Sequence, residues 1–285
     1  MRLALVTNDA SGGGTDAGAV AALLAAAGAD VTVHDLGALD GGGAALLAGA
    51  PERLVVAGGD GTIGPVAAVA AGAGLPLAVV PTGTANDFAR ALGLPLDAGE
   101  AARAAARRDA PTRRIELLRA GDRPFLNAAS AGLSVLAARR ARALKHRLGP
   151  LAYAAGALRA GVAGRPLPCR VVVDGRELFA GACWQAIVAG TGAFGGGARL
   201  DAADPHDGLL DVAVLEAGPR AALVRRAYGM RAGGLADQAG VHHARGRVAE
   251  LELPAGTRFN VDGEVCELRP ARLQSRGERV EVVVA

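Results

Sequence analysis

A glycine-rich segment with one acid, Gly58–Thr62 (GGDGT), follows a predicted strand at Leu54–Ala57 and precedes a predicted helix. Glycines in such a turn let the backbone approach a ligand with no Cβ atom in the way. The amides that begin the next helix, together with the helix dipole, favour an anion such as a phosphate group. Asp60 would repel that anion unless a cation bridges them, so the segment predicts a phosphate site that uses Mg²⁺. The plainer alternative is a strand–helix turn with Asp60 or Thr62 as its N-cap.

A second polar segment, Pro81–Arg90 (PTGTANDFAR), follows the next apolar run and again precedes a predicted helix. Thr84 can cap that helix, and Asn86 and Asp87 fall in its first turn. Two acid-bearing loops at neighbouring strand ends make one shared site, whereas a single such loop could be incidental. The pair therefore favours the phosphate-site interpretation.

The elements that must position these loops alternate between apolar strands and Ala-rich helices over the first 118 residues. This alternation is typical of βα units in a parallel sheet, whose ligands bind at the carboxyl ends of the strands. The predicted strands are Leu3–Thr7, Val31–His34, Leu54–Ala57, Leu77–Val80 and Arg114–Leu118, and the predicted helices are Asp16–Ala27, Gly43–Ala48, Thr62–Ala71, Ala85–Leu92 and Asp97–Arg108.

After about residue 118 the pattern changes. Helical periodicity persists over Leu133–Val162, but period-2 segments dominate beyond it, with turn signals at Asp174-Gly175 and Asp262-Gly263. A run of short strands of this kind predicts an antiparallel sandwich or barrel. We therefore expect an α/β nucleotide-binding domain at 1–118 and a β-sandwich domain at 119–285. This assignment leaves open that the last strand of the chain pairs within the first domain.

Composition narrows the classes of protein that the chain can be. It has 285 residues, 51% hydrophobic and 21% charged, and this hydrophobic content excludes a disordered chain. The net charge of +3 is too small for a nucleic-acid-binding stripe. The cysteines Cys169, Cys183 and Cys266 lack CxxC spacing, so a reducing cytosol fits better than a disulfide framework or a zinc cluster. Asn8 and Asp9 interrupt the first apolar run, and neither a signal peptide nor a membrane span is predicted.

The segments GGDGT at 58–62 and PTGTANDFAR at 81–90 together resemble the diacylglycerol kinase catalytic domain family, which includes bacterial soluble lipid kinases and sphingosine kinases. The first segment is shared with NAD kinases, and the second is more specific. The resemblance continues through Asn8 with Ser11-Gly12, Phe125–Asn127 with Ala131–Leu133, Gly149–Tyr153, Gly195–Gly197, Asp207–Asp211 and Phe259–Glu264.

The resemblance implies an α/β nucleotide domain joined to a β-sandwich domain, with the active site in the cleft. The implied activity is an ATP- and Mg²⁺-dependent kinase that phosphorylates the hydroxyl of diacylglycerol or a similar long-chain alcohol. The nucleotide site would consist of Asn8, Ser11, Gly12, Gly58, Gly59, Asp60, Gly61, Thr62, Gly83, Thr84 and Asn86.

Three further groups of residues receive roles only from the resemblance. A catalytic Mg²⁺ would be held through water by Asp60, Asp87 and Glu116. Asp262, with Glu264 beside it, corresponds to the base that takes the proton from the lipid hydroxyl. A second, structural Mg²⁺ would be held by Asp204, Asp207 and Leu209.

Several residues also admit other interpretations. Asp262-Gly263 between two strand-like runs is most simply a type I′ hairpin turn. After GGDGT the chain has Ile63-Gly64-Pro65 where the family usually has an Asn-Glu pair, although a proline is acceptable at a helix start. Glu116 replaces the usual Asp. An NAD kinase, or a nucleotide-binding homologue with little or no turnover, therefore stays open beside the lipid kinase.

The basic segment Arg139–Arg147 (RRARALKHR) is either a solvated helix face or a patch against anionic lipid, at roughly 1 kcal/mol per basic residue. A peripheral kinase needs attraction to an anionic bilayer without insertion. The sequence therefore predicts a cytoplasmic protein with a lipid substrate, peripheral contact with an anionic membrane surface and no nucleic-acid partner, and it leaves a homodimer open.

Overall fold

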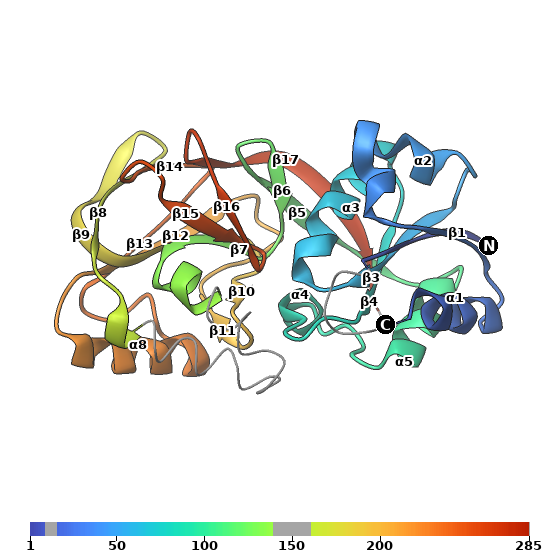
Figure 1. The fold of residues 1–285 in the computed structure, drawn as a ribbon, viewed down its shortest axis with the longest axis horizontal. Coiled ribbons are helices and arrows are strands. Elements are labelled where there is room, and N and C mark those ends of the chain that lie inside the picture. Colours follow the sequence, from blue (N-terminus) through green and yellow to red (C-terminus); the bar gives the residue numbers. More distant parts are fainter. Residues whose placement is uncertain (9–15, 139–160, 285) are drawn as a thin grey trace. The chain divides into compact units, whose positions relative to one another are not determined.

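The chain's structure is a computed structural model that describes residues 1–8, 16–138 and 161–284 (Figure 1). It divides into two compact units, residues 1–117 with 278–285 and residues 118–277, called unit 1 and unit 2 below. Two strands, β5 (Thr112–Ala120) and β17 (Arg272–Val283), contribute residues to both units.

Unit 1 is an α/β unit. Its other elements are β1 (Arg2–Thr7), α1 (Ala17–Ala26), β2 (Asp30–His34), the 3₁₀ helix η1 (Leu36–Gly43), α2 (Ala44–Leu47), β3 (Arg53–Gly58), α3 (Asp60–Ala73), β4 (Leu77–Pro81), α4 (Asp87–Ala91) and α5 (Ala98–Ala106). The strands pair in parallel in the order β4-β3-β1-β2, and β17 joins β4 in parallel at Val282. β3 and β4 are buried at every residue, as expected for a parallel sheet covered on both faces.

Unit 2 is mainly antiparallel β-structure. Its elements are β6 (Arg123–Phe125), β7 (Ala128–Gly132), β8 (Leu167–Val173), β9 (Arg176–Ala189), β10 (Ala193–Phe194), β11 (Ala198–Arg199), β12 (Leu210–Glu216), α8 (Arg220–Ala232), β13 (Val241–Gly246), β14 (Val248–Glu252), β15 (Arg258–Val261) and β16 (Glu264–Glu267). The strands follow the order β16-β15-β7-β9-β8-β14-β17, and β12 pairs with β9 and β13. Its core contains Phe125, Val171, Val188, Val212 and Phe259.

The predicted fold class, a parallel α/β domain followed by an antiparallel β-sandwich domain, is confirmed, because the parallel strands precede the antiparallel strands in the chain. The segments Gly149–Tyr153 and Arg139–Arg147 lie outside the described residues. In the part of the chain that the structure describes, no helix is both long and apolar enough to cross a membrane.

Candidate functional site

The loops after β3 and β4 meet at the carboxyl ends of these two strands in unit 1. The amide of Thr82 donates to the carbonyl oxygen of Gly58 over 3.1 Å. A Cβ atom on Gly83 would lie 2.6 Å from the Cα of Gly59, so this close approach requires glycine at position 83. The two glycine-bearing segments therefore lie against each other, as a shared site would require.

The end of β1 adds a third loop to this surface. Nδ2 of Asn8 donates to Oγ1 of Thr62 over 3.4 Å, and Thr62 is itself buried. Ser11 and Gly12, which the sequence places in the same nucleotide site, lie outside the described residues.

Asp60 is bonded to the start of the neighbouring helix α4. Its Oδ1 accepts from the amide of Phe88 over 2.8 Å, and its Oδ2 accepts from the amide of Asp87 over 3.1 Å. These are two of the amides that a helix start leaves without an intrahelical acceptor, and the helix dipole stabilises a negative charge there. The two segments that carry the family resemblance are thus held together by one carboxylate.

Two sequence expectations about these loops, and the alternative of an N-cap at Asp60 or Thr62, were wrong in their local detail. The N-cap of α4 is Asn86, at φ 50°, rather than Thr84, which is exposed. α3 begins at Asp60 with Gly59 as its N-cap, so neither Asp60 nor Thr62 caps it. Pro65 consequently lies inside α3 and cannot donate to the carbonyl of the residue four positions before it.

In unit 2, Asp262 and Gly263 form the two-residue turn between β15 and β16, with φ values of +46° and +88°. Positive φ at both positions is type I′ geometry. The Asp262 carboxylate is buried and accepts three amides, from Leu126 over 2.8 Å and from Asn127 and Ala128 over 3.0 Å each. Asp262 therefore fixes the segment in which β7 begins.

Two neighbours of this turn also make defined contacts. Glu264 forms an ion pair with Arg123 of β6. Burial lowers the pKa of Arg123, but the hydrogen bond and ion pair with Glu264, together with Cys266 and Asp262, more than offset this, and the pKa is raised overall. The Oδ1 of Asn127, which is buried, accepts from Oγ1 of Thr191 over 2.7 Å. Sequence reasoning gave Asn127 no role, and its place in the Phe125–Asn127 segment was the only signal.

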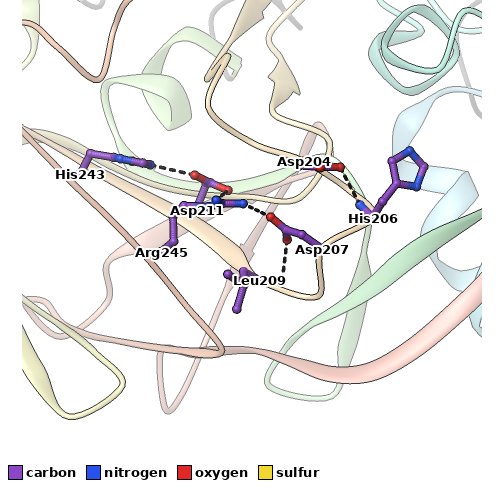
Figure 2. Close-up of polar contacts among 7 residues, drawn as sticks. All are labelled: Asp204, His206, Asp207, Leu209, Asp211, His243 and Arg245. Carbon is purple, nitrogen blue, oxygen red and sulfur yellow. Dashed lines mark hydrogen bonds and ion pairs between the residues drawn. The ribbon is translucent and has the colours of Figure 1, made fainter.

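The Asp204–Asp211 segment forms a polar cluster that includes strand β13 (Figure 2). Asp207 Oδ1 accepts from the amide of Leu209 over 2.9 Å, and its Oδ2 pairs with Arg245. Asp211 is fully buried, pairs with Arg245 over 3.5 Å and contacts Nε2 of His243 over 2.8 Å. The charges in this turn are thus partly compensated by the strand opposite it.

Comparison with known proteins gives a matching family model for each of the two units. The diacylglycerol kinase catalytic domain model matches residues 2–120, and the model of the YegS C-terminal NAD kinase beta sandwich-like domain matches residues 127–284. A diacylglycerol kinase of Mycobacterium tuberculosis is 31% identical over 246 residues, which cover 84% of this chain and 79% of that protein. The chain belongs to the diacylglycerol kinase catalytic domain family.

Further relatives of this lipid kinase homologue are also kinases by name. A probable lipid kinase, YegS-like, of Pseudomonas aeruginosa is 37% identical over 234 residues, covering 79% of this chain and 74% of that protein. A solved structure of a putative diacylglycerol kinase from Bacillus anthracis has a TM-score of 0.78 at 21% identity, covering 100% of this chain and 97% of that one. An NAD kinase from Archaeoglobus fulgidus in complex with ATP shares the fold, with a TM-score of 0.55 at 15% identity over 99% of this chain and 93% of that one.

The acids assigned to the catalytic Mg²⁺ are Asp60, Asp87 and Glu116. Asp87 and Glu116 are buried, and Glu116 lies 3.7 Å from Nε of Arg279. Among the described residues, no three His, Cys, Asp or Glu side chains are grouped so that they could hold a metal. Mg²⁺ usually keeps several waters and takes one or two carboxylates beside substrate phosphates, so Asp60 and Asp87 fit an ion that arrives with a nucleotide. Their role stays a prediction.

The structural Mg²⁺ also stays a prediction. Two carboxylates and a main-chain carbonyl, from Asp204, Asp207 and Leu209, are oxygen ligands of the kind that Mg²⁺ takes. Asp204 Oδ1 already accepts from the amide of His206 over 3.0 Å, and Asp207 already pairs with Arg245. The turn therefore has direct protein partners.

Unit 2 contains an apolar cavity of about 170 Å³ against one face of α8. Its apolar lining includes Leu133, Ala137, Phe194, Leu215, Leu223 and Met230. A cavity of about 150 Å³ holds one benzene molecule. This cavity therefore has room for part of one hydrocarbon chain.

Proposed function

We propose that this chain transfers the γ-phosphoryl group of ATP to the hydroxyl of diacylglycerol or a related long-chain lipid alcohol. The observation that carries the proposal is the Asp60 carboxylate, which joins the GGDGT and PTGTANDFAR segments of a member of this family. The apolar cavity of unit 2 supports a lipid rather than NAD as the phosphoryl acceptor.

In unit 1, the start of α3 is the proposed phosphate site. Its N-cap is Gly59, no side chain caps the helix through a hydrogen bond, and the dipole of this 14-residue helix favours an anion there. Asn8 and Thr62 position the adjoining loop. Mg²⁺ bound with the nucleotide, and held through water by Asp60 and Asp87, would neutralise phosphate charge, as in phosphoryl transfer generally.

In unit 2, Asp262 is the proposed base. It takes the proton from the lipid hydroxyl while the hydroxyl oxygen bonds to the γ-phosphorus, and the bond to the bridging oxygen breaks to release ADP. The amides of Leu126, Asn127 and Ala128 hold the carboxylate in one orientation for this step. A positioned general base contributes about 10²- to 10⁴-fold to a rate.

The proposal is tested by incubating the full chain with radiolabelled ATP, Mg²⁺ and, separately, dioleoylglycerol, sphingosine, monoacylglycerol and NAD. We expect label in at least one lipid and none in NAD. Label in NAD alone would establish the NAD kinase function instead. Nucleotide binding in a thermal-shift assay without turnover on any acceptor would mean a homologue that binds but does not catalyse.

The cavity gives a second test, through chain length. Ala137 is buried and lines the cavity, so Ala137→Phe fills space that a hydrocarbon chain would occupy. We expect kcat/KM for dioleoylglycerol to fall at least about tenfold, the scale on which hydrophobic pockets discriminate. Dioctanoylglycerol, whose shorter chains need less of the cavity, is the control substrate. An equal loss for both substrates would show that the cavity does not receive the chain.

A further inference from the structure

The helix α8 in unit 2 (orange in Figure 1) presents unusually exposed apolar side chains. Val224 is 74% exposed and Tyr228 72%, and they lie four positions apart, hence on one face of the helix. Val162, at 69%, lies in the segment whose carbonyls at Gly161 and Gly164 accept from Arg220 at the start of α8. The other large exposed apolar side chains of the described residues are all below 50% exposed and belong to unit 1.

The same helix carries a concentrated positive charge. α8 has four arginines, Arg220, Arg225, Arg226 and Arg231, and no acid. Arg220, Arg225 and Arg226 donate to main-chain carbonyls, and within the described part of the chain none of the four pairs with a carboxylate. Arg226 is buried, which leaves Arg220, Arg225 and Arg231 as the exposed arginines of the helix, and the guanidinium of Arg220 lies 5.2 Å over the Trp184 ring.

Several arginines elsewhere in the chain do have acidic partners. Arg108 pairs with Glu52 over 2.8 Å, and Arg114 pairs with Glu281 over 2.6 Å. Arg170 pairs with both Glu177 and Glu252. α8 differs from these in gathering four arginines, with no carboxylate partner among the described residues, in one 13-residue helix.

We propose that Val224, Tyr228 and the exposed arginines of α8, here called the α8 face, dock the protein on an anionic lipid bilayer. Exposed basic groups are attracted to anionic lipids, and exposed apolar and aromatic side chains beside them can enter the headgroup region. A second copy of the chain is disfavoured, because two such faces would bring like charges together. The inference rests on the proposed function, since a lipid kinase must reach a substrate held in a membrane.

The test is sedimentation of the full chain with vesicles of phosphatidylcholine alone or mixed with phosphatidylglycerol. Two variants remove parts of the α8 face, Val224→Ser with Tyr228→Ser, and Arg225→Glu. Matched controls in unit 1 are Leu96→Ser, at a partly exposed leucine, and Arg113→Glu, at an exposed arginine. The substituted α8 side chains are exposed, so unchanged circular dichroism and thermal midpoints are expected for all variants.

We expect the unsubstituted chain to bind only the mixed vesicles. Arg225→Glu, which changes the charge by two units, should weaken that binding about tenfold or more, and the serine pair should weaken it comparably, with both controls unchanged. Equal binding to the two kinds of vesicle, or α8 variants that bind like the controls, would overturn the proposal. A dimer in analytical ultracentrifugation that α8 substitutions abolish would also overturn it, because a second copy would then cover the face.

A kinase assay separates failure of docking from failure of the proposed function. Dispersed dioctanoylglycerol requires no bilayer, so α8 variants should phosphorylate it at the unsubstituted rate but lose activity on dioleoylglycerol in mixed vesicles. Vesicle binding that depends on the α8 face, in a protein without kinase activity, would leave the docking inference standing and remove the proposed function. Equal activity of all variants on vesicle-embedded substrate would contradict the docking inference alone.

Discussion

The turns Asp262-Gly263 and Asp174-Gly175 in unit 2 are nearly the same structure used twice. Both aspartates have φ +46°, and the glycines have φ +88° and +77°. In each turn the Asp amide donates to a neighbouring strand, from Asp262 to the carbonyl of Ala128 over 3.0 Å and from Asp174 to that of Val248 over 2.9 Å. Each connects two antiparallel strands, β15 to β16 and β8 to β9.

The two carboxylates also accept equivalent hydrogen bonds. Asp174 accepts from the amides of Arg247 and Val248, where β14 begins, just as Asp262 accepts from the amides where β7 begins. Asp174 is exposed, however, whereas Asp262 is buried beside Asn127. The backbone geometry of an Asp-Gly turn is therefore no evidence of chemistry, and only burial and neighbours distinguish Asp262.

The largest difference in stability should follow from removing each carboxylate. Asp262→Ala leaves three amides without their acceptor, at buried positions 126–128, and a buried group without a partner costs about 1–3 kcal/mol. We expect the free energy of unfolding to fall by about 3 kcal/mol in that variant. We expect a fall of only about 1 kcal/mol in Asp174→Ala, because this position is exposed and water can accept from the amides instead. Urea unfolding measures both, and equal losses would remove burial as the distinction.

A smaller and equal effect should follow from replacing the glycines. A Cβ atom on Gly175 or Gly263 meets nothing within 4 Å, so Gly175→Ala and Gly263→Ala add only the cost of a left-handed backbone. That cost is about 1–2 kcal/mol for a residue with a Cβ. Thermal unfolding of the two variants should give matching losses. A much larger loss at position 263 would mean that the two turns differ in their backbones after all.

The smallest effects on stability should come from the flanking glutamates. Glu264 pairs with Arg123, and Glu177 pairs with Arg170, with each glutamate about half exposed. Exposed ion pairs contribute roughly 0–1 kcal/mol, so Glu264→Gln and Glu177→Gln should both unfold nearly like the unsubstituted chain. If Glu264 assists Asp262, kcat falls only in Glu264→Gln. Unchanged turnover in both variants would remove Glu264 from the proposed site.

Sequence patterns predicted the features that depend on local periodicity and on loop composition. The β3–α3 and β4–α4 loops, and their shared site, follow from two glycine-bearing segments after apolar strands. What these patterns missed is the partner of Asp60. The Asp60 carboxylate accepts from the amides of Asp87 and Phe88, which lie 27 and 28 residues further along the chain, and no periodicity encodes such a contact. The sequence argument named only a cation as the partner of the Asp60 charge, whereas the amides of helix α4 stabilise that charge as well, and the role of Asp60 toward Mg²⁺ stays a prediction.

Two other misses have similarly physical causes. Pro65 was expected at a helix start, but Asp60 and Gly61 are already helical, so the helix begins earlier and includes the proline. Arg245 had no predicted role because strand register sets it opposite Asp211, and register cannot be derived from either strand alone. In both cases the deciding interaction lies outside the segment that sequence reasoning considered.

The most direct test of the account compares kcat for lipid phosphorylation in Asp262→Asn and Asp174→Asn. Asparagine keeps one oxygen that can accept from amides but cannot take a proton from a hydroxyl. In Asp262→Asn the side-chain nitrogen faces the amide of Leu126 and that hydrogen bond is lost, so circular dichroism and thermal unfolding first establish that both variants are folded. With Asp262 as the base, we expect kcat to fall at least about 100-fold in Asp262→Asn and to stay near the unsubstituted value in Asp174→Asn. Equal kcat values in the two folded variants would contradict the account, because Asp262 would then be no more than a turn residue.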